Sequence, residues 1–494
     1  MSDPAARRSG IGPCLSVGLA FLISRVFYAL AGVRFETNLV QFNFQFMDVD
    51  LMKHRLAESL WYYHMQPPLH NLMVGLIVKA FPNNYGPPLH ILFMAMGLAS
   101  AFLLYRLMRI LKVPAWLAST VTILFVVSPG CVLFENFPMY EYPIMLLLLG
   151  QSVALYELLR NPRWGWSLLF FSLLAALALL RAFYHLAYLV AVAAALAIYF
   201  KTNRKMILAT SALPILLVFA LFTKNLMLFG FFGSSSWGGN NLPTVTTHNL
   251  TPEECKSLVA AGKLDPFGCI EGASPPEAYR AWIAPRKPTG IPVLDQERKS
   301  TGEVNLNNSI YLETGPRYTQ TALQVLRYYP QAYLRSVAIA WFCYFRPPDD
   351  FFQFEENRAR ISGLARLSDL LLFGEWRQAS GKELRSLQAR GGSASLLLYT
   401  GIFLIVAIPA ILLATAILWF HDWRLGENSR IRLYVIAFMV LQIVMVAGIA
   451  NFLSSFENNR YRFPTDPLYL ALAAMLIARA WSRIRTPARS RLID

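Results

Sequence analysis

Two aspartates, Asp48 and Asp50, lie just after an apolar run and are the first residues whose types and spacing suggest catalysis. A carboxylate beside a low-dielectric boundary can have a raised pKa and accept a proton from a hydroxyl or an amine. Two residues apart on an extended segment, their side chains share one face. The alternative is that one of them caps the following helical run by accepting backbone N–H groups.

Three arginines are candidates for binding a phosphate group. Arg181 ends an apolar run, whereas Arg460 and Arg462 flank Tyr461 in the segment NNRYRFP. A guanidinium can bind phosphate through two parallel N–H bonds, which makes arginine suited to this role. For Arg181, the alternative is a side chain that extends along the end of a span to the membrane interface. Lys224, near the end of a later apolar run, is a weaker phosphate candidate.

Acids and other polar residues lie in or near the same connections. Glu135 and Glu141 can either pair with the arginines or bind an acceptor, whereas Arg25, inside the first apolar run, is expected to pair with an acid within the bundle. His64 and His70 lack a third ligand at a suitable spacing, so we expect no metal site. The remaining candidates for contacts with an acceptor or sugar are Tyr140, Tyr461, His64 and His185.

The composition requires a membrane. Of the 494 residues, 55% are hydrophobic and only 15% are charged, and the mean hydropathy is +0.41. Soluble domains have a charged fraction nearer to about a quarter. The net charge of +16 comes from short Lys and Arg clusters between apolar runs. Such clusters are typical of topological signals, so we expect membrane lipids and no nucleic acid as partners.

Apolar runs of about 20 residues, oriented by the basic residues of short loops, predict an all-α polytopic protein with about ten transmembrane helices. The N-terminal run is interpreted as a retained signal anchor with its amino end in the cytoplasm. The predicted spans are residues 12–34, 88–110, 115–133, 142–159, 166–180, 184–200, 206–229, 395–420, 431–454 and 466–481.

The first external loop is predicted to carry two interfacial helices. Residues 50–63 have helical composition that ends at Pro67 and Pro68, and the apolar run 69–81 is too short to span comfortably. Together with spans one to seven, this loop makes up a predicted transmembrane module, residues 1–230.

Residues 231–394 are polar and rich in Gly, Pro, Asn and Arg, and they predict a small external domain of mixed structure. Cys255 and Cys269 lie together in this domain and could form a disulfide in an oxidising compartment. Residues 333–345 are apolar, but counting them as a span would place the basic C-terminal tail outside. We therefore interpret them as an amphipathic or re-entrant piece, followed by a C-terminal transmembrane module, residues 395–494.

The predicted topology places the two aspartates, the two glutamates, Arg181 with His185, and the Arg460 loop on one side of the membrane. The predicted position of that loop is external, and short external loops normally contain few Lys and Arg residues, yet this loop has two arginines. Ionisable groups of both signs at the edge of a helical bundle indicate a functional site.

The order of these features resembles the GT-C superfamily of membrane glycosyltransferases, in particular the protein O-mannosyltransferase and aminoarabinose transferase branch. Members of that branch have an early acid in the first external loop, matched by Asp48 or Asp50, and two juxtamembrane helices, the second led by a Pro-containing motif, matched by residues 66–69, QPPL. They also have a basic residue after the fifth span, matched by Arg181, and a late external loop matched by RYRFP, residues 460–464. The resemblance does not extend to residues 231–394.

The resemblance implies inverting transfer of a sugar from a polyprenyl-phosphate donor to a glycan, lipid or protein acceptor, without a metal or other cofactor. The aspartate would deprotonate the acceptor and the arginines would hold the phosphate leaving group. Because this chain offers two acids, we rank Asp48 above Asp50. The alternatives are a transporter or flippase of a lipid-linked or anionic substrate, and a non-catalytic assembly subunit. We expect a bacterial inner membrane, with the site facing the periplasm or exterior.

Overall fold

The computed structural model describes residues 4–284, 287–375, 400–424 and 427–485, and these fold into α-helices and short 3-10 turns. The described residues contain no β-strand, and their one isolated β-bridge pairs Arg298 with Val304. The expected all-α architecture is therefore confirmed for this part of the chain. The mixed structure expected for residues 231–394 is wrong for its described residues, which contain helices and turns but no strand. Several of these short helices have Pro in the first turn, and Thr251 and Asp265 cap two of them.

Several long apolar helices indicate a multi-pass membrane protein. By length and composition, six helices among the described residues can cross a membrane, and a seventh crossing results if one bent pair counts as a single span. The other predicted spans correspond to shorter or more polar helices: α10 (Trp164–Leu180), α11 (Leu186–Tyr199) and α25 (Asp466–Arg485). The six helices are α1 (Pro4–Leu30), α6 (Gly86–Ile110), α9 (Glu141–Arg160), α12 (Arg204–Phe229), α22 (Ile402–Asp422) and α23 (Glu427–Leu453).

The run predicted as one span over residues 115–133 is broken into α7 (Ala115–Val126) and α8 (Pro129–Glu135), which meet at a bend of 58°. The break follows from the sequence, because Pro129 has no N–H to donate and Ser128 caps α8 by accepting from Cys131 N. Gly130 then packs closely against Pro348, since a Cβ added there would lie 2.7 Å from Pro348 Cγ.

The loop between α1 and α6 begins with the short helix α2 (Leu39–Phe42). Where two interfacial helices were expected, it then contains three: α3 (Val49–His54), α4 (Leu56–Trp61) and α5 (Leu69–Ala80). The run 50–63 divides at Arg55, whose φ of −132° and ψ of 34° are not helical. The turn brings Leu56 against Gly75 of α5, where an added Cβ would lie only 2.4 Å from Leu56 Cδ1. Leu56 is buried in this contact, which packs α4 against α5.

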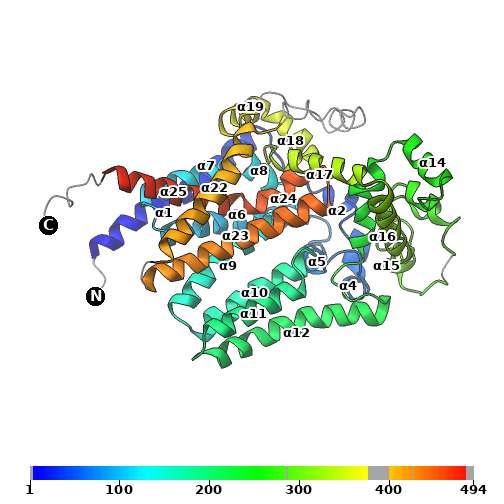
Figure 1. Cartoon of the computed structure of the whole chain (residues 1–494), viewed down its shortest axis with the longest axis horizontal. Helices are drawn as coiled ribbons and strands as arrows, with labels where there is room; N and C mark the ends of the chain where they lie inside the picture. Colours follow the sequence, from blue (N-terminus) through cyan, green and yellow to red (C-terminus); the bar gives the residue numbers. More distant parts are fainter. Residues whose placement is uncertain (1–3, 285–286, 376–399, 425–426, 486–494) are drawn as a thin grey trace.

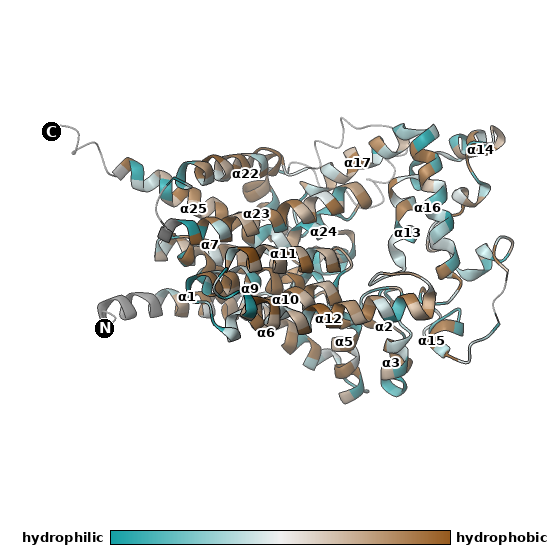
Figure 2. Ribbon diagram, turned by 60° about the horizontal axis from the view of Figure 1, so that its bottom comes forward, coloured by the Kyte–Doolittle hydropathy of each residue, from teal (hydrophilic) through white to brown (hydrophobic). Residues whose placement is uncertain are grey.

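The polar helices α14 (Pro252–Ala260), α15 (Pro292–Asp295) and α16 (Tyr311–Tyr328) lie at one end of the molecule, whereas α1 and α25 reach the opposite end (Figure 1). Hydropathy follows the same division, because hydrophobic residues dominate α6, α9, α10, α12 and α23, whereas α14 and α16 mix both kinds (Figure 2). The helices α14, α15 and α16 thus lie beyond one end of the apolar bundle.

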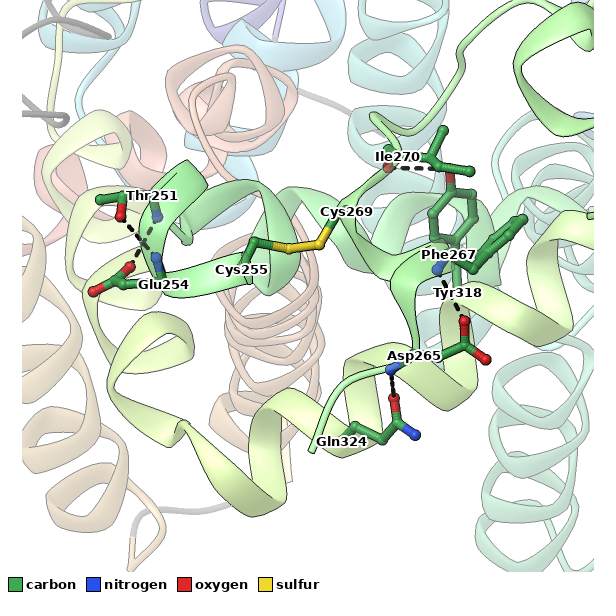
Figure 3. Close-up of a disulfide and its surroundings, with 9 residues drawn as sticks. All are labelled: Thr251, Glu254, Cys255, Asp265, Phe267, Cys269, Ile270, Tyr318 and Gln324. Carbon is green, nitrogen blue, oxygen red and sulfur yellow. Dashed lines mark hydrogen bonds between the residues drawn. A yellow bond between two sulfur atoms is a disulfide. The ribbon is translucent and has the colours of Figure 1, made fainter. Parts of the chain in front are cut away.

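A disulfide joins Cys255 of α14 to Cys269 at the end of the 3-10 turn η3 (Pro266–Cys269), as Figure 3 shows. The pairing that the sequence left open is therefore made in the structure. Thr251 and Glu254 form a capping box at the start of α14 (Figure 3).

Residues 333–345 belong to α17 (Pro330–Tyr344), a helix of 15 residues that packs against α23 and α24 (Asn458–Arg462). This length is below the roughly 20 residues of a typical span. The predicted boundary at residues 394–395 lies outside the described residues, as does the start of the predicted span 395–420, whose described part is α22.

Candidate functional site

Two arginines from distant parts of the chain face the same two aromatic rings. The guanidinium carbon of Arg181 lies 4.1 Å from the centroid of the Tyr140 ring and 5.2 Å from that of Tyr461. The corresponding distances for Arg460 are 5.3 and 5.9 Å. Tyr140 precedes α9, Arg181 follows α10, and the other two residues lie in α24. We call these four residues the arginine–tyrosine cluster. The sequence predicted the convergence of a larger set of polar groups, and the meeting of Arg181 with Arg460 is one part of it.

Arg460 is only 2% exposed, and its charge is balanced by two acids. Its Nε donates to Glu141 Oε1 at 2.6 Å, and its Nη1 donates to Glu457 Oε2 at 2.8 Å. Its Nη2 donates to the Tyr140 hydroxyl at 3.1 Å and to Gln45 Oε1 at 3.3 Å. Burial acts to lower the pKa of Arg460, but the two carboxylates outweigh it and raise the pKa.

Arg181 is also buried, at 7% exposure, but no carboxylate of the described residues lies within 4.0 Å of its nitrogens. Its guanidinium stacks on Tyr140, Tyr461 and Phe183, the last at 4.6 Å. Burial lowers the pKa of Arg181 to about 10, and the charge of Arg460 adds to the effect. The hydroxyl of Tyr461 and the more distant carboxylate of Glu457 oppose this lowering without reversing it. At neutral pH, Arg181 is therefore a buried cation with no carboxylate in direct contact, which is the property an anion-binding residue needs.

The loop between α1 and α6 reaches this cluster through Gln45 and His70. The His70 ring centroid lies 5.7 Å from that of Tyr140, and its Nε2 donates to Pro138 O at 3.2 Å. Burial lowers the pKa of His70 to about 4, so the ring is neutral at physiological pH. Its buried Nδ1 has no hydrogen-bond partner in the described residues. The loop thus adds an amide and a neutral imidazole beside the arginines.

The two aspartates occupy different environments. Asp48 is 7% exposed and is the N-cap of α3: its Oδ1 accepts from Asp50 N at 3.1 Å and from Ser300 Oγ at 2.5 Å, and its Oδ2 accepts from Ser300 N at 2.8 Å. The Asp50 side chain is 62% exposed and lies 3.6 Å from His54 Nε2. Three residues span at most about 11 Å, so the backbone of Asp48 lies within that distance of Gln45.

Arg462 does not join the arginine–tyrosine cluster. Its Nε donates to Asp466 Oδ1 at 2.9 Å, and its Nη1 donates to the carbonyl of Tyr344. Its Nη2 is buried without a partner among the described residues. These contacts join the end of α17 to the start of α25, next to the cluster.

Glu135 and Glu141 pair with different arginines. Arg25 binds Glu135 through two bonds, at 2.8 and 2.7 Å, and Tyr142 donates to the same carboxylate at 2.7 Å. This confirms that Arg25 pairs with an acid inside the bundle. Glu135 is fully buried there, whereas Glu141 belongs to the surroundings of Arg460.

Lys224 and His185 make local contacts. Lys224 Nζ donates to the carbonyls of Trp61 and Tyr63, at 2.9 and 3.2 Å, and so satisfies the C-terminal end of α4. His185 is exposed, and its Nδ1 accepts from Ala187 N at 3.2 Å as the N-cap of α11.

His64 is fully buried where the loop between α1 and α6 meets the segment that follows α12. Its Nδ1 lies 2.7 Å from Ser236 Oγ and its Nε2 lies 2.9 Å from Asn307 O. Because a carbonyl can only accept, Nε2 carries the proton and Nδ1 accepts from the serine. In the part of the chain that the structure describes, no group of three or more His, Cys, Asp or Glu side chains could hold a metal ion.

No family model, curated protein or solved structure matches the chain. The site is therefore defined by its own geometry. Of its members, Gln45, Glu457 and Ser300 were not anticipated from the sequence. The spacing of Glu457 three residues before Arg460 in a helical turn is a signal that could have identified it. No local pattern marks Gln45 or Ser300, because their partners are far away in the chain.

Proposed function

We propose that this protein is an inverting glycosyltransferase that moves a sugar from a polyprenyl-phosphate donor to an acceptor on the extracytoplasmic side of the membrane. The observation that supports this most is Arg181, a buried guanidinium with no carboxylate of the described residues in direct contact, beside Arg460 at the end of an apolar bundle. A lipid chain can lie along apolar helices while its phosphate lies at the bundle end. Arg181 would then neutralise that phosphate.

In the proposed reaction, a proton leaves the acceptor O–H for the carboxylate of Asp48, and the acceptor oxygen bonds to the anomeric carbon. The bond from that carbon to the phosphate oxygen breaks at the opposite face, and its electron pair leaves with polyprenyl phosphate. Arg181 stabilises the negative charge on the leaving group. Arg460 is already paired with Glu141 and Glu457, so its part is to hold Tyr140 and Tyr461 in place. No cofactor enters this step.

The choice of Asp48 over Asp50 follows from their surroundings. Asp48 is enclosed near Gln45, whose side chain contacts Arg460, whereas Asp50 faces solvent. A base must lie close to the group that binds the donor, since both act on the same sugar. The disulfide in the external segment supports a site that faces the periplasm of a bacterial inner membrane.

The test uses the full chain in lipid nanodiscs with a panel of labelled undecaprenyl-phosphate monosaccharides and a mixture of candidate acceptors. Release of undecaprenyl phosphate is the readout, because it does not depend on the identity of the sugar. We expect Asp48→Asn to abolish release, Arg181→Gln to raise the donor KM, and Arg280→Gln, an exposed external arginine, to match wild type. Equal release from wild type and Asp48→Asn would contradict the assignment of the base.

Transport of a lipid-linked anion is a second candidate, and one observation favours it. The α7–α8 pair is a broken helix of the kind that transporters use to bind substrates in the membrane, whereas the sequence predicted a continuous span. Its break is capped by Ser128, and α8 contains Glu135, which is paired with Arg25. Movement of labelled undecaprenyl phosphate across proteoliposomes, without cleavage of any donor, would favour this function over transfer.

A further inference from the structure

A hairpin of the external segment, residues 297–305, forms a strap over the first loop. Its two arms pair through Asn305 N to Glu297 O at 2.9 Å and Lys299 N to Glu303 O at 2.8 Å. Gly302, with a φ of +86°, allows the turn that an L side chain would strain. The strap is thus a defined small unit of the chain.

Three consecutive residues of the strap bind three positions of the first loop. Lys299 Nζ donates to Asn43 O at 2.8 Å, and the Thr301 hydroxyl donates to Gln41 O at 3.3 Å. Between them, the hydroxyl and the backbone N–H of Ser300 both donate to the carboxylate of Asp48, at 2.5 and 2.8 Å. Ser300 itself is exposed, as are Gly302 and Glu303. These contacts are polar, so the strap can leave the loop without uncovering a hydrophobic core.

The hydroxyl of Ser300 makes the contact that a reacting hydroxyl would make. Its O–H points at the carboxylate oxygen at 2.5 Å, the distance expected for a charge-assisted bond between a hydroxyl and a general base. Asp48 already accepts three hydrogen bonds from the chain itself. An acceptor can therefore meet this oxygen only after the Ser300 hydroxyl has moved away.

We infer that the strap is an internal substitute for the acceptor: Ser300 occupies the place of a hydroxyl acceptor at Asp48, and the strap lifts when the acceptor binds. This rests on the proposed function of Asp48 as the base. The acceptor class is a hydroxyl, of a sugar, a lipid headgroup or a seryl side chain.

The test compares Ser300→Ala with two matched variants of the full chain in nanodiscs. Ser300→Thr keeps the hydroxyl, and Thr301→Ala removes the neighbouring hydroxyl, which bonds to Gln41 and not to Asp48. Two rates of undecaprenyl phosphate release from the labelled donor panel are measured, one with water as the only acceptor and one with a series of methyl glycosides. A hydrogen bond to a charged group is strong enough that its loss should raise strap opening about ten-fold or more.

We expect Ser300→Ala to raise the hydrolysis of donor by water about ten-fold and to lower the KM for the methyl glycoside. Ser300→Thr should match wild type, and Thr301→Ala, which loses only a neutral bond of 3.3 Å to Gln41, should change both quantities less than Ser300→Ala does. Lower kcat with an unchanged KM in Ser300→Ala would show that Ser300 orients Asp48, and would overturn the strap. If release requires Asp48 but is identical in wild type and Ser300→Ala, the strap is not a substitute for the acceptor, and the proposed function is unaffected. No release by any variant would overturn the proposed function, and the role of the strap with it.

Discussion

Replacing Glu141 with glutamine tests whether the charge balance of the arginine–tyrosine cluster is as the structure indicates. Glu141 and Arg460 are each 2% exposed and share a 2.6 Å bond, and the second carboxylate oxygen, Oε2, is buried without a partner in the described residues. The glutamine preserves the shape and an acceptor atom but removes the negative charge. The cluster then holds two cations, Arg181 and Arg460, against the single acid Glu457.

Leaving one member of a buried ion pair without its partner costs about 3–5 kcal/mol, and the remaining Glu457 places this variant at the lower end, near 3 kcal/mol. The unfolding entropy is about 2 cal/mol/K per residue, so for 494 residues a loss of that size lowers the Tm by about 3 °C. The measurement is the thermal unfolding of the detergent-solubilised protein, followed by tryptophan fluorescence.

Glu457→Gln is the matched control, because it removes the same charge from the same arginine at a site that is 23% exposed. Water solvates that position, so its Tm should fall by about 1 °C or less. The double variant Glu141→Gln with Arg460→Gln should lose less than the two single variants together, because the unpaired cation is gone. Equal losses for both glutamates, or strict additivity in the double variant, would refute a buried Arg460–Glu141 pair.

Four further outcomes follow from the structure. Arg181→Gln should lower the affinity for undecaprenyl phosphate about ten-fold or more, as measured by tryptophan quenching, and should leave the Tm unchanged or raised, because a buried unbalanced charge is removed. Reduction of the Cys255–Cys269 disulfide, which closes a short loop, should destabilise the external segment by about 3 kcal/mol, visible as faster proteolysis there. Gly239→Ala should destabilise the protein by more than the usual cost of overpacking, which is about 1–3 kcal/mol. The added Cβ would lie 2.3 Å from the backbone oxygen of Gly315 in α16, which cannot move aside. Thermal unfolding measures the loss. Burial lowers the pKa of Lys299 to about 8 when the strap is docked, whereas the free side chain titrates near 10.5. Docking therefore favours the neutral amine, so it should be weakest below pH 8 and strengthen between about pH 8 and 10.5. Hydrogen exchange of the strap, corrected for intrinsic rates, measures this, and Lys299→Met should remove the pH dependence.

The apolar runs and their lengths determined the class of this protein without reference to any fold. A run of about 20 apolar residues is long enough to cross the hydrocarbon core of a membrane. Within lipid, such a run must form a helix, because each backbone polar group needs a partner inside the segment. The helices α6, α9, α12 and α23 lie within about two residues of their predicted bounds at most ends, α23 beginning earlier. The pairing of Arg25 with an acid also followed from the cost of a lone charge in the bundle.

Breaks within elements followed less readily from composition. Pro129 and Ser128 supply a local reason for the bend after α7, but a proline in a transmembrane helix is often accommodated by its neighbours, so its outcome depends on packing. The division at Arg55 is governed by the contact between Leu56 and Gly75, two residues on different helices. Such contacts are absent from the local pattern of either helix.

The site was anticipated only in part. Sidedness alone brought Arg181, Arg460, Tyr140 and Glu141 to one end of the bundle, because loops on one face of a membrane share a compartment. Differences of a few ångströms decide that Arg460, and not Arg181, contacts a carboxylate, and that Asp48, and not Asp50, contacts a hydroxyl. These contacts were decided by segments more than 250 residues apart, as when Ser300 reaches Asp48 and Arg460 reaches Gln45. Only the tertiary structure could decide them, because hydrogen bonds and ion pairs depend on distance in space, and spacing along the chain does not fix it.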